Sequence, residues 1–242
     1  MGERGAGRPL SRMGRLPRSF FERDVLDVAP DLLGCTITHA RVTVRVTETE
    51  AYAGYRHDPG SHAFRGETRR TAPMFARAGF TYVYFTYGMH WMLCLVTGPP
   101  GLAQAVLVRA GEVVGGADVA RLRRPGTDPR EWCRGPARLA ATLALDGTST
   151  GRDFCRPLAT RDRHGHAVTT PPIDLVVAAP AGPPDPSRIR TGPRVGVRGA
   201  GGDAAAYPWR FWLDGERTVS AYRPGVARRR PVTGDGATPP RP

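Results

Sequence analysis

The sequence contains no lysine, so arginine supplies all 35 residues counted as Lys+Arg. A mechanism that forms a Schiff base through a lysine amine is therefore excluded. Cysteine is scarce, and the four thiols form no CxxC pair and have no zinc-ligand spacing with histidine: Cys35, Cys94, Cys133 and Cys155. We therefore expect reduced intracellular thiols, with neither a disulfide framework nor a bound metal.

Long hydrophobic runs are also missing. No apolar stretch approaches the ~20 residues of a transmembrane helix. The start of the chain, MGERGAGRPLSRMGRLPR, is basic and lacks the apolar segment of a secretory signal. These features predict a cytoplasmic protein without a membrane association.

Acidic residues are outnumbered, with 22 against 35 basic residues and a formal net charge of +13. Such an excess suits a polyanionic partner, most simply a nucleic acid. Basic ends of the chain are a competing explanation, and the run Arg228-Arg229-Arg230 fits it. Five arginines nevertheless lie within the body of the chain: Arg121, Arg123, Arg124, Arg134 and Arg138. The charge therefore favours a nucleic-acid partner.

Arginine, proline and glycine concentrate at both ends of the chain. We expect residues 1–16 to form a disordered basic arm and residues 224–242 a disordered Arg/Pro-rich tail. Residues 17–223 are predicted to form one domain, with a helix that ends at Gly34 and another that begins at Pro136. Alternating or apolar segments predict strands within 42–50, 80–86, 91–98, 102–110, 173–179, 194–197 and 209–213, with a turn at 87–90. The predicted fold is α+β, with a curved, mostly antiparallel sheet flanked by helices.

Glu50 ends the first predicted strand. Strict alternation along this strand gives one face to Val42, Val44, Val46, Glu48, Glu50 and Tyr52. The valines mark that face as the core side, and a carboxylate there has to be paired, hydrogen-bonded or functional. Glu50 is therefore either satisfied by an arginine as part of the structure or catalytic, and Glu48 is a candidate structural partner.

Arg109 also ends a predicted strand. It either orients Glu50, or a water beside it, or is a solvated strand end. The two predicted strands within 80–98 form a hairpin. Tyr82 and Tyr84 share one face of this hairpin, and we expect Tyr82 in the core.

The tip of this hairpin carries Tyr87, Gly88 and Met89. An exposed aromatic ring at a hairpin tip is suited to stacking between bases. With a carboxylate and a basic surface, these rings suggest chemistry on a base extruded from nucleic acid.

The chain resembles the alkyladenine (3-methyladenine) DNA glycosylase family in its bacterial form. The resemblance extends from about Phe20 to Tyr222 and rests, in the family's order, on FFERDVLDVAPDLLG, TETEAYAG, SHAFRG, TYVYFTYGMHW, VLVRA, GPARL and PRVGV. It implies an enzyme that flips alkylated or deaminated purines out of double-stranded DNA and hydrolyses the N-glycosidic bond with a Glu-activated water, leaving an abasic site. It further implies a monomer without cofactors, acting on DNA in the bacterial nucleoid.

The resemblance also implies roles for particular residues. Glu50 would be the general base, and Arg109 and the backbone carbonyl of Val195 would help to hold the attacking water. The base pocket would be lined by Tyr52, His62, Tyr84 and Cys94. DNA would be intercalated by Tyr87 and Met89, and its backbone contacted by Gly135 and Arg138 at the start of the GPARL helix.

Two positions depart from the family's pattern. The run Thr68-Arg69-Arg70-Thr71 stands where the family usually has a proline and an asparagine, and Cys94 stands where it typically has a pocket asparagine. The second departure concerns base selectivity rather than the chemistry. Two alternatives belong to other classes. One is a protein that flips or shields lesions without cleaving them; the other is an RNA-binding domain of related fold, which would not account for TETEAY, YGMH and VLVRA together.

Overall fold

The computed structural model describes residues 14–155, 159–161, 167–169 and 173–225. Most of the expected basic arm and tail lies outside these residues. Arg15 and Leu16, which the prediction assigned to the arm, belong to the domain. Arg15 forms an isolated antiparallel β-bridge with Ala178, and the N–H of Leu16 donates to the carbonyl of Val177 at 2.9 Å. The domain therefore begins before residue 17, because this backbone extends the edge of the sheet.

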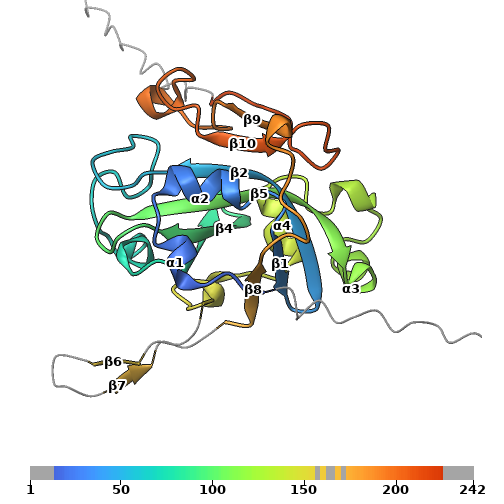
Figure 1. Ribbon diagram of the computed structural model, residues 1–242, viewed down its shortest axis with the longest axis horizontal. Helices are drawn as coiled ribbons and strands as arrows, with labels where there is room; N and C mark the ends of the chain where they lie inside the picture. Colours follow the sequence, from blue (N-terminus) through green and yellow to red (C-terminus); the bar gives the residue numbers. More distant parts are fainter. Residues whose placement is uncertain (1–13, 156–158, 162–166, 170–172, 226–242) are drawn as a thin grey trace, which may run out of the picture.

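The centre of the fold is an eight-stranded sheet whose ladders are antiparallel (Figure 1). Its strands are β1 (Thr36–His39), β2 (Val42–Tyr52), β3 (Thr81–Thr86), β4 (His90–Thr97), β5 (Gln104–Gly115), β8 (Leu175–Ala178), β9 (Ile189–Gly192) and β10 (Arg210–Leu213). The order is β3-β4-β5-β2-β1-β8, and β10 pairs with both β2 and β9. A separate two-stranded sheet contains β6 (Ala159–Arg161) and β7 (Ala167–Thr169). The predicted α+β class with an antiparallel sheet is confirmed.

Short helices accompany the sheet. The α-helices are α1 (Arg18–Phe21), α2 (Val25–Asp31), α3 (Ala117–Arg123) and α4 (Pro136–Thr142), and the 3-10 turns are η2 (Ala72–Phe75), η3 (Pro129–Glu131), η4 (Gly147–Ser149), η5 (Pro186–Arg188) and η6 (Gly199–Gly202). The first predicted helix is divided in two because Asp24 adopts extended backbone and caps α2, its side chain accepting from the N–H of Leu26.

The predicted strand at residues 194–197 is wrong. Val195 and Gly196 form a turn, with φ of 73° at Gly196. The strand of this region lies earlier in the chain, at β9. The turn brings the backbone of Val195 toward β2, which matters for the site described below.

Two hydrophobic clusters lie on opposite faces of the sheet. The first, which we call the helix face, packs against α2 and α4 and includes Val28, Leu93, Leu95, Val106, Val108 and Leu139. The second, which we call the pocket face, includes Met74, Tyr82, Cys94, Ala105 and Leu107. Successive residues of β4 and β5 alternate between the two faces, as the pleat of a strand requires.

A β-bulge in β2 changes the direction of its glutamates. Val46 lies opposite Gly111 of β5, and Glu48 lies opposite the next residue, Ala110. Thr47 is therefore an extra residue in the ladder. Such an insertion reverses the alternation of all residues that follow it.

The contacts of β2 show this reversal. Before the bulge, the residues on the helix face are Val42, Val44 and Val46. After it, Ala51 packs on that face, and the hydroxyl of Thr49 donates to Ala29 of α2 at 2.8 Å. The prediction that the valines share a face with Glu48, Glu50 and Tyr52 is therefore wrong: these three residues point away from the helix face, and Tyr52 packs against the cluster of the pocket face.

Candidate active site

The Glu50 carboxylate is fully buried, and it has two hydrogen-bond donors and one ion-pair partner. The Tyr52 hydroxyl donates to Oε2 at 2.9 Å, and the backbone N–H of Val195 donates to Oε1 at 2.6 Å. Nη1 of Arg109 lies 3.3 Å from Oε2. A carboxylate offers about four acceptor directions, and the two hydrogen bonds use two of them, one on each oxygen.

Arg109 owes its position to a second irregularity in the same ladder. Ala110 pairs with Glu48 and Val108 with Thr49, which leaves Arg109 as the extra residue of β5. Its Nε donates to Glu48 at 2.8 Å, and the attraction of both glutamates outweighs the cost of burial, so that the pKa of Arg109 is raised. Arg109 is therefore a permanent cation between two carboxylates.

Glu48 holds this arrangement from the other side. Burial opposes its ionisation, but Arg109 and Arg210 and the donors of Ser220 outweigh it, and the pKa of Glu48 is lowered. Arg210 donates to Oε1 at 2.7 Å, and the N–H of Ser220 donates to Oε2 at 2.7 Å. Glu48 thus has the structural role that the sequence suggested, while Glu50 faces the pocket wall.

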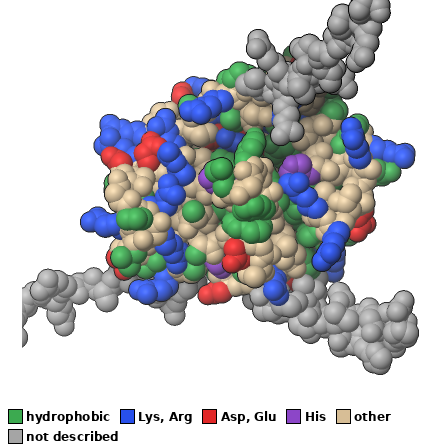
Figure 2. Space-filling model, turned by 180° about the vertical axis from the view of Figure 1, so that it is seen from behind, with side chains coloured by type: hydrophobic (Ala, Val, Ile, Leu, Met, Phe, Trp, Pro, Cys, Tyr) green, Lys and Arg blue, Asp and Glu red, His purple; other side chains and the backbone are tan. Residues whose placement is uncertain are grey.

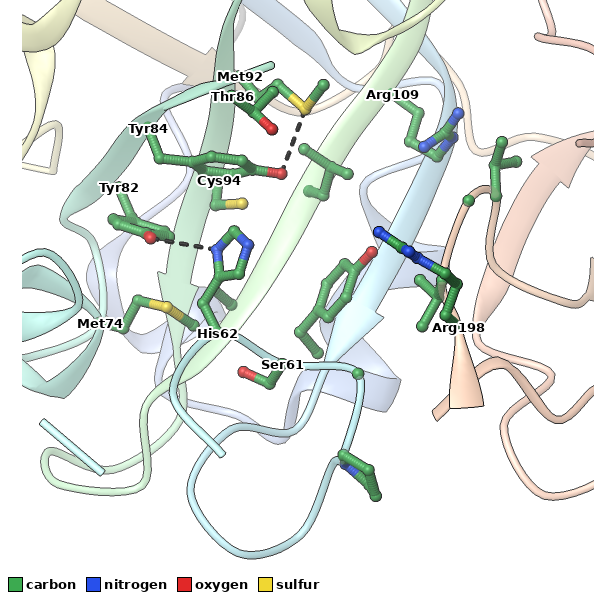
Figure 3. Close-up of a pocket in the computed structure, with 18 of the residues that line it drawn as sticks. Ser61, His62, Met74, Tyr82, Tyr84, Thr86, Met92, Cys94, Arg109 and Arg198 are labelled. Atoms are coloured by element: carbon green, nitrogen blue, oxygen red, sulfur yellow. Dashed lines mark hydrogen bonds between the residues drawn. The ribbon is translucent and has the colours of Figure 1, made fainter. Parts of the chain in front are cut away.

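A cavity of about 270 Å³ lies beside Glu50, near the lower end of ligand-sized pockets, which run from about 300 Å³ upward. Tyr52, Arg109 and Val195, the three residues that hold Glu50, all line it. The other lining residues include Ser61, His62, Met74, Tyr82, Tyr84, Met92, Cys94 and Arg198. Figure 3 shows the rings of Tyr82 and Tyr84 on one side of the cavity and the guanidinium groups of Arg109 and Arg198 on the other.

Aromatic rings give the cavity flat walls. Tyr82 and Tyr84 stack with centroids 5.2 Å apart, and the ring of His62 lies edge-on to Tyr84 at 4.8 Å. Nδ1 of His62 lies 3.3 Å from the Tyr82 hydroxyl. Desolvation, aided by the charge of Arg70, lowers the pKa of His62 to about 4, so its ring is neutral at physiological pH. This set of surfaces suits a flat ligand.

Cys94 is buried in the same wall, opposite Tyr82 on β3 and Leu107 on β5. Burial, and then the charge of Glu50, raises the pKa of its thiol. A neutral thiol is a weak hydrogen-bonding group. This position therefore contributes shape rather than a polar contact.

The tip of the β3–β4 hairpin is exposed. Tyr87 is 75% exposed and Met89 67%. Tyr87 and Gly88 both have positive φ (53° and 68°), as in the type I′ turn that fixes a hairpin. Figure 2 shows hydrophobic side chains gathered in the middle of one face, with arginines around them.

Gly135 and Arg138 do not line the cavity. Gly135, with φ of 111°, precedes the first turn of α4. Arg138 forms an ion pair with Glu131, which also pairs with Arg134 at 2.7 Å. Arg138 is exposed and Glu131 is partly exposed, and such pairs contribute little to stability, so Arg138 can exchange this carboxylate for another anion.

Sequence reasoning missed several residues of the site. Asp58 and Arg194 form a buried ion pair behind the cavity, and Arg198 projects into it. Arg194 belongs to the PRVGV segment, whose only assigned role was that of Val195. Asp58 and Arg194 are 136 residues apart, so no local pattern could have joined them.

Neither a metal centre nor a membrane span is present in the described part of the chain. Among these residues, no group of three or more His, Cys, Asp or Glu side chains is placed to hold a metal ion. No helix among them is long and apolar enough to cross a membrane.

Comparison with known proteins agrees with this geometry. The model of the Methylpurine-DNA glycosylase (MPG) family matches residues 19–217. A Streptomyces avermitilis protein is 48% identical over 220 residues, covering 89% of this chain and 95% of its own length. Relatives from Frankia casuarinae and Burkholderia orbicola are 46% and 40% identical, covering 85% and 87% of this chain and 92% and 93% of their own lengths. All three bear the name 3-methyladenine DNA glycosylase.

An aromatic cavity beside a held carboxylate, on a basic protein with these relatives, defines a DNA glycosylase, a class of DNA-repair enzyme. More particularly, the chain belongs to the methylpurine-DNA glycosylase family, and the resemblance found in its sequence is confirmed. An RNA-binding domain of related fold is thereby excluded.

Proposed function

We propose that this enzyme flips an alkylated or deaminated purine out of double-stranded DNA into the aromatic cavity and hydrolyses its N-glycosidic bond. The observation that carries the proposal is the Glu50 carboxylate. It is held by Tyr52, Val195 and Arg109, all of which line the cavity. Two hydrogen bonds and an ion pair would hold this carboxylate where it accepts a proton from a water in the cavity.

In the reaction, the electron pair of the C1′–N bond leaves with the base, and the sugar develops positive charge. The water oxygen bonds to C1′ and its proton passes to Glu50. A purine alkylated on a ring nitrogen is cationic and leaves as a neutral base. An uncharged lesion such as hypoxanthine leaves with the electron pair as an anion, which then takes up a proton from solvent. The negative charge of Glu50 stabilises the positive sugar as it forms, and general-base assistance contributes about 10²–10⁴-fold. Arg109, whose Nη1 lies 3.3 Å from Oε2, helps to hold the carboxylate of Glu50 in place.

The flat walls of the cavity support the proposed binding of the base. Tyr84, Tyr52 and His62 present rings to it. Flipping costs a few kcal/mol and is cheapest for a damaged pair, which gives part of the selectivity. The Tyr87 ring, with Met89 beside it, would fill the space that the base leaves in the duplex. Arginines such as Arg138 and Arg198 would meet the backbone phosphates.

The absence of lysine supports a monofunctional enzyme, one that releases the base without cutting the strand. Strand cleavage by a lyase requires an amine that forms a Schiff base with the sugar. The N-terminal amine is the only aliphatic amine of this sequence. We expect borohydride to trap no covalent protein–DNA adduct, and an adduct that survives N-terminal truncation would contradict this.

The proposed mechanism calls for no residue of a second copy of the chain, and we propose that the enzyme acts as a monomer. The basic charge and the bacterial relatives support the proposal that the enzyme acts on DNA in the nucleoid. A protein that binds lesions without cleaving them would use the same cavity. That alternative would not explain why Glu50 is held by Tyr52, Val195 and Arg109.

The test is base release from defined duplexes. Duplexes that carry hypoxanthine or 1,N6-ethenoadenine should yield free base and an abasic site, and the undamaged duplex should not. Tight binding of the damaged duplexes without any release would instead support the lesion-binding alternative.

A further inference from the structure

Arg194 and Asp58 form an ion pair in which both side chains are fully buried. Nη1 donates to Oδ2 at 2.6 Å and Nη2 to Oδ1 at 2.7 Å, which is a bidentate contact. Burying two charges is costly unless the geometry is good and the remaining polar atoms find partners. The further contacts of Arg194 and Asp58 identify the segments that this ion pair connects.

The guanidinium of Arg194 joins three parts of the fold. Nη1 donates to the carbonyl of Ala51 in β2 at 3.0 Å, and Nη2 donates to the carbonyl of Gly201 in η6 at 2.7 Å. Its central carbon lies 4.5 Å from the centre of the Tyr52 ring and 5.3 Å from that of Trp209, within cation–π range. The ring of Tyr52 is thus fixed against a buried cation.

Asp58 anchors the loop that carries His62. Its carboxylate also accepts from the N–H of Ala53 at 3.2 Å and from that of Gly60 at 2.8 Å. A Cβ at Gly60 would lie 2.5 Å from Nη2 of Arg194, so the loop approaches the guanidinium as closely as its backbone allows. The pair therefore ties the loop to β2.

These contacts converge on Glu50. Tyr52, whose ring lies on the guanidinium, donates to Oε2. Val195, which follows Arg194 directly in the chain, donates to Oε1. One guanidinium thus places two hydrogen-bond donors of Glu50, Tyr52 through its ring contact and Val195 through the backbone.

We propose that Arg194 and Asp58 are positioning residues of the catalytic site, which aim the Tyr52 hydroxyl and the Val195 N–H at the two oxygens of Glu50. The inference rests on the proposed role of Glu50. The pair touches neither base nor sugar in this scheme. It acts on the chemical step through geometry, where a misplacement of about 1 Å can cost about 10²-fold in rate.

Arg194→Lys is the first test, because lysine keeps the charge but lacks the planar fork. Arg18→Lys is a matched control outside the cavity: Arg18 pairs with the buried Asp153 at 2.7 Å and donates to the carbonyl of Ala78 at 2.5 Å. Both variants should melt at lower temperature. Only Arg194→Lys should lower the single-turnover rate of base release, by about tenfold or more, with lesion-DNA affinity nearly unchanged.

A second measurement separates positioning from general destabilisation. If Arg194 acts through Tyr52, then Tyr52→Phe should lower the rate of base release by a smaller factor in Arg194→Lys than in the parent enzyme. Full additivity of the two rate losses would contradict the proposal.

A neutral double variant covers the case in which Arg194→Lys does not fold. Asp58→Asn with Arg194→Gln leaves no unpaired buried charge, so it should fold, yet its release rate should stay about tenfold or more below the parent's. A folded variant with the parental rate would show that the pair is only structural. Glu50→Gln, measured in parallel, keeps the two proposals apart: its retained activity would refute the role of Glu50 itself.

Discussion

The Tyr52 hydroxyl lies 2.9 Å from the carboxylate of Glu50, two residues earlier on the same strand. Residues two apart on a strand share a face, and the bulge at Thr47 makes that face the pocket face. The other partners of Glu50 are Val195 and Arg109, which come from distant segments. The site is therefore a strand end whose carboxylate is completed by a turn and a neighbouring strand.

Tyr52→Phe removes one donor from Glu50 and should slow base release by roughly 10-fold to 10²-fold, since a hydrogen bond to a charged group contributes about 1.5–3 kcal/mol. Burial, and then the charge of Glu50, raises the pKa of Tyr52 well above its ordinary value. The hydroxyl therefore stays protonated in mild alkali. In the parent enzyme, the single-turnover rate of base release should not fall near pH 10. A fall near pH 10 in the parent that is absent from Tyr52→Phe would contradict this assignment.

His62 should titrate with a pKa of about 4, because desolvation and Arg70 disfavour its cation. The folded-state pKa lies below that of the unfolded chain, about 6.5. Its contribution to stability is thus present above pH 6.5 and is lost as the pH falls toward 4. Melting curves of His62→Gln should decline less steeply over this range than those of the parent. An NMR titration midpoint near 6.5 would refute the prediction.

Tyr87→Ala should weaken binding of lesion DNA while leaving the melting temperature nearly unchanged. The ring is 75% exposed, so its loss opens no core cavity, whereas stacking on a base contributes about 1–3 kcal/mol. Leu122→Ala is the matched control, an exposed hydrophobic residue (82%) on α3. If Tyr87→Ala and Leu122→Ala weaken binding of lesion DNA equally, then Tyr87 has no specific role in DNA binding.

Cys94 should relax discrimination against guanine-type bases, because cysteine leaves room for the 2-amino group that an asparagine would exclude. Cys94→Asn is expected to lower the release of 3-methylguanine or 7-methylguanine relative to 3-methyladenine. Cys94→Ser, of similar size, should leave this ratio unchanged. If Met92, which lines the same wall, has refilled the space, then the ratio will not fall in Cys94→Asn and the proposal fails.

The sequence predicted six strands of the central sheet (β2, β3, β4, β5, β8 and β10), its antiparallel pairing and the family. Long alternating segments and ordered motifs are local patterns, which is why they could be found. It placed the glutamates on the wrong face because one inserted residue, Thr47, cannot be seen in a period of two. The turn at Val195 was predicted as a strand since its apolar residues alternate, while Gly196 in fact takes a positive φ.

The support of the site could not be predicted from the sequence. Glu48, Arg210 and Ser220 meet only after β10 and the segment behind it fold against β2. The ion pair of Asp58 and Arg194 likewise depends on the tertiary fold. Carboxylates and arginines carry no periodic signal, so their partners are fixed by three-dimensional contact alone.

The central claim is that Glu50 acts on the water, and Glu50→Gln tests it most directly. The amide keeps the shape of the side chain but cannot accept the proton. Single-turnover release of hypoxanthine from a duplex should fall by at least about 10²-fold, the lower end of what a general base contributes, while the affinity for the lesion duplex stays nearly unchanged. Release within about tenfold of the parent rate, by a folded variant that binds the duplex normally, would contradict the account.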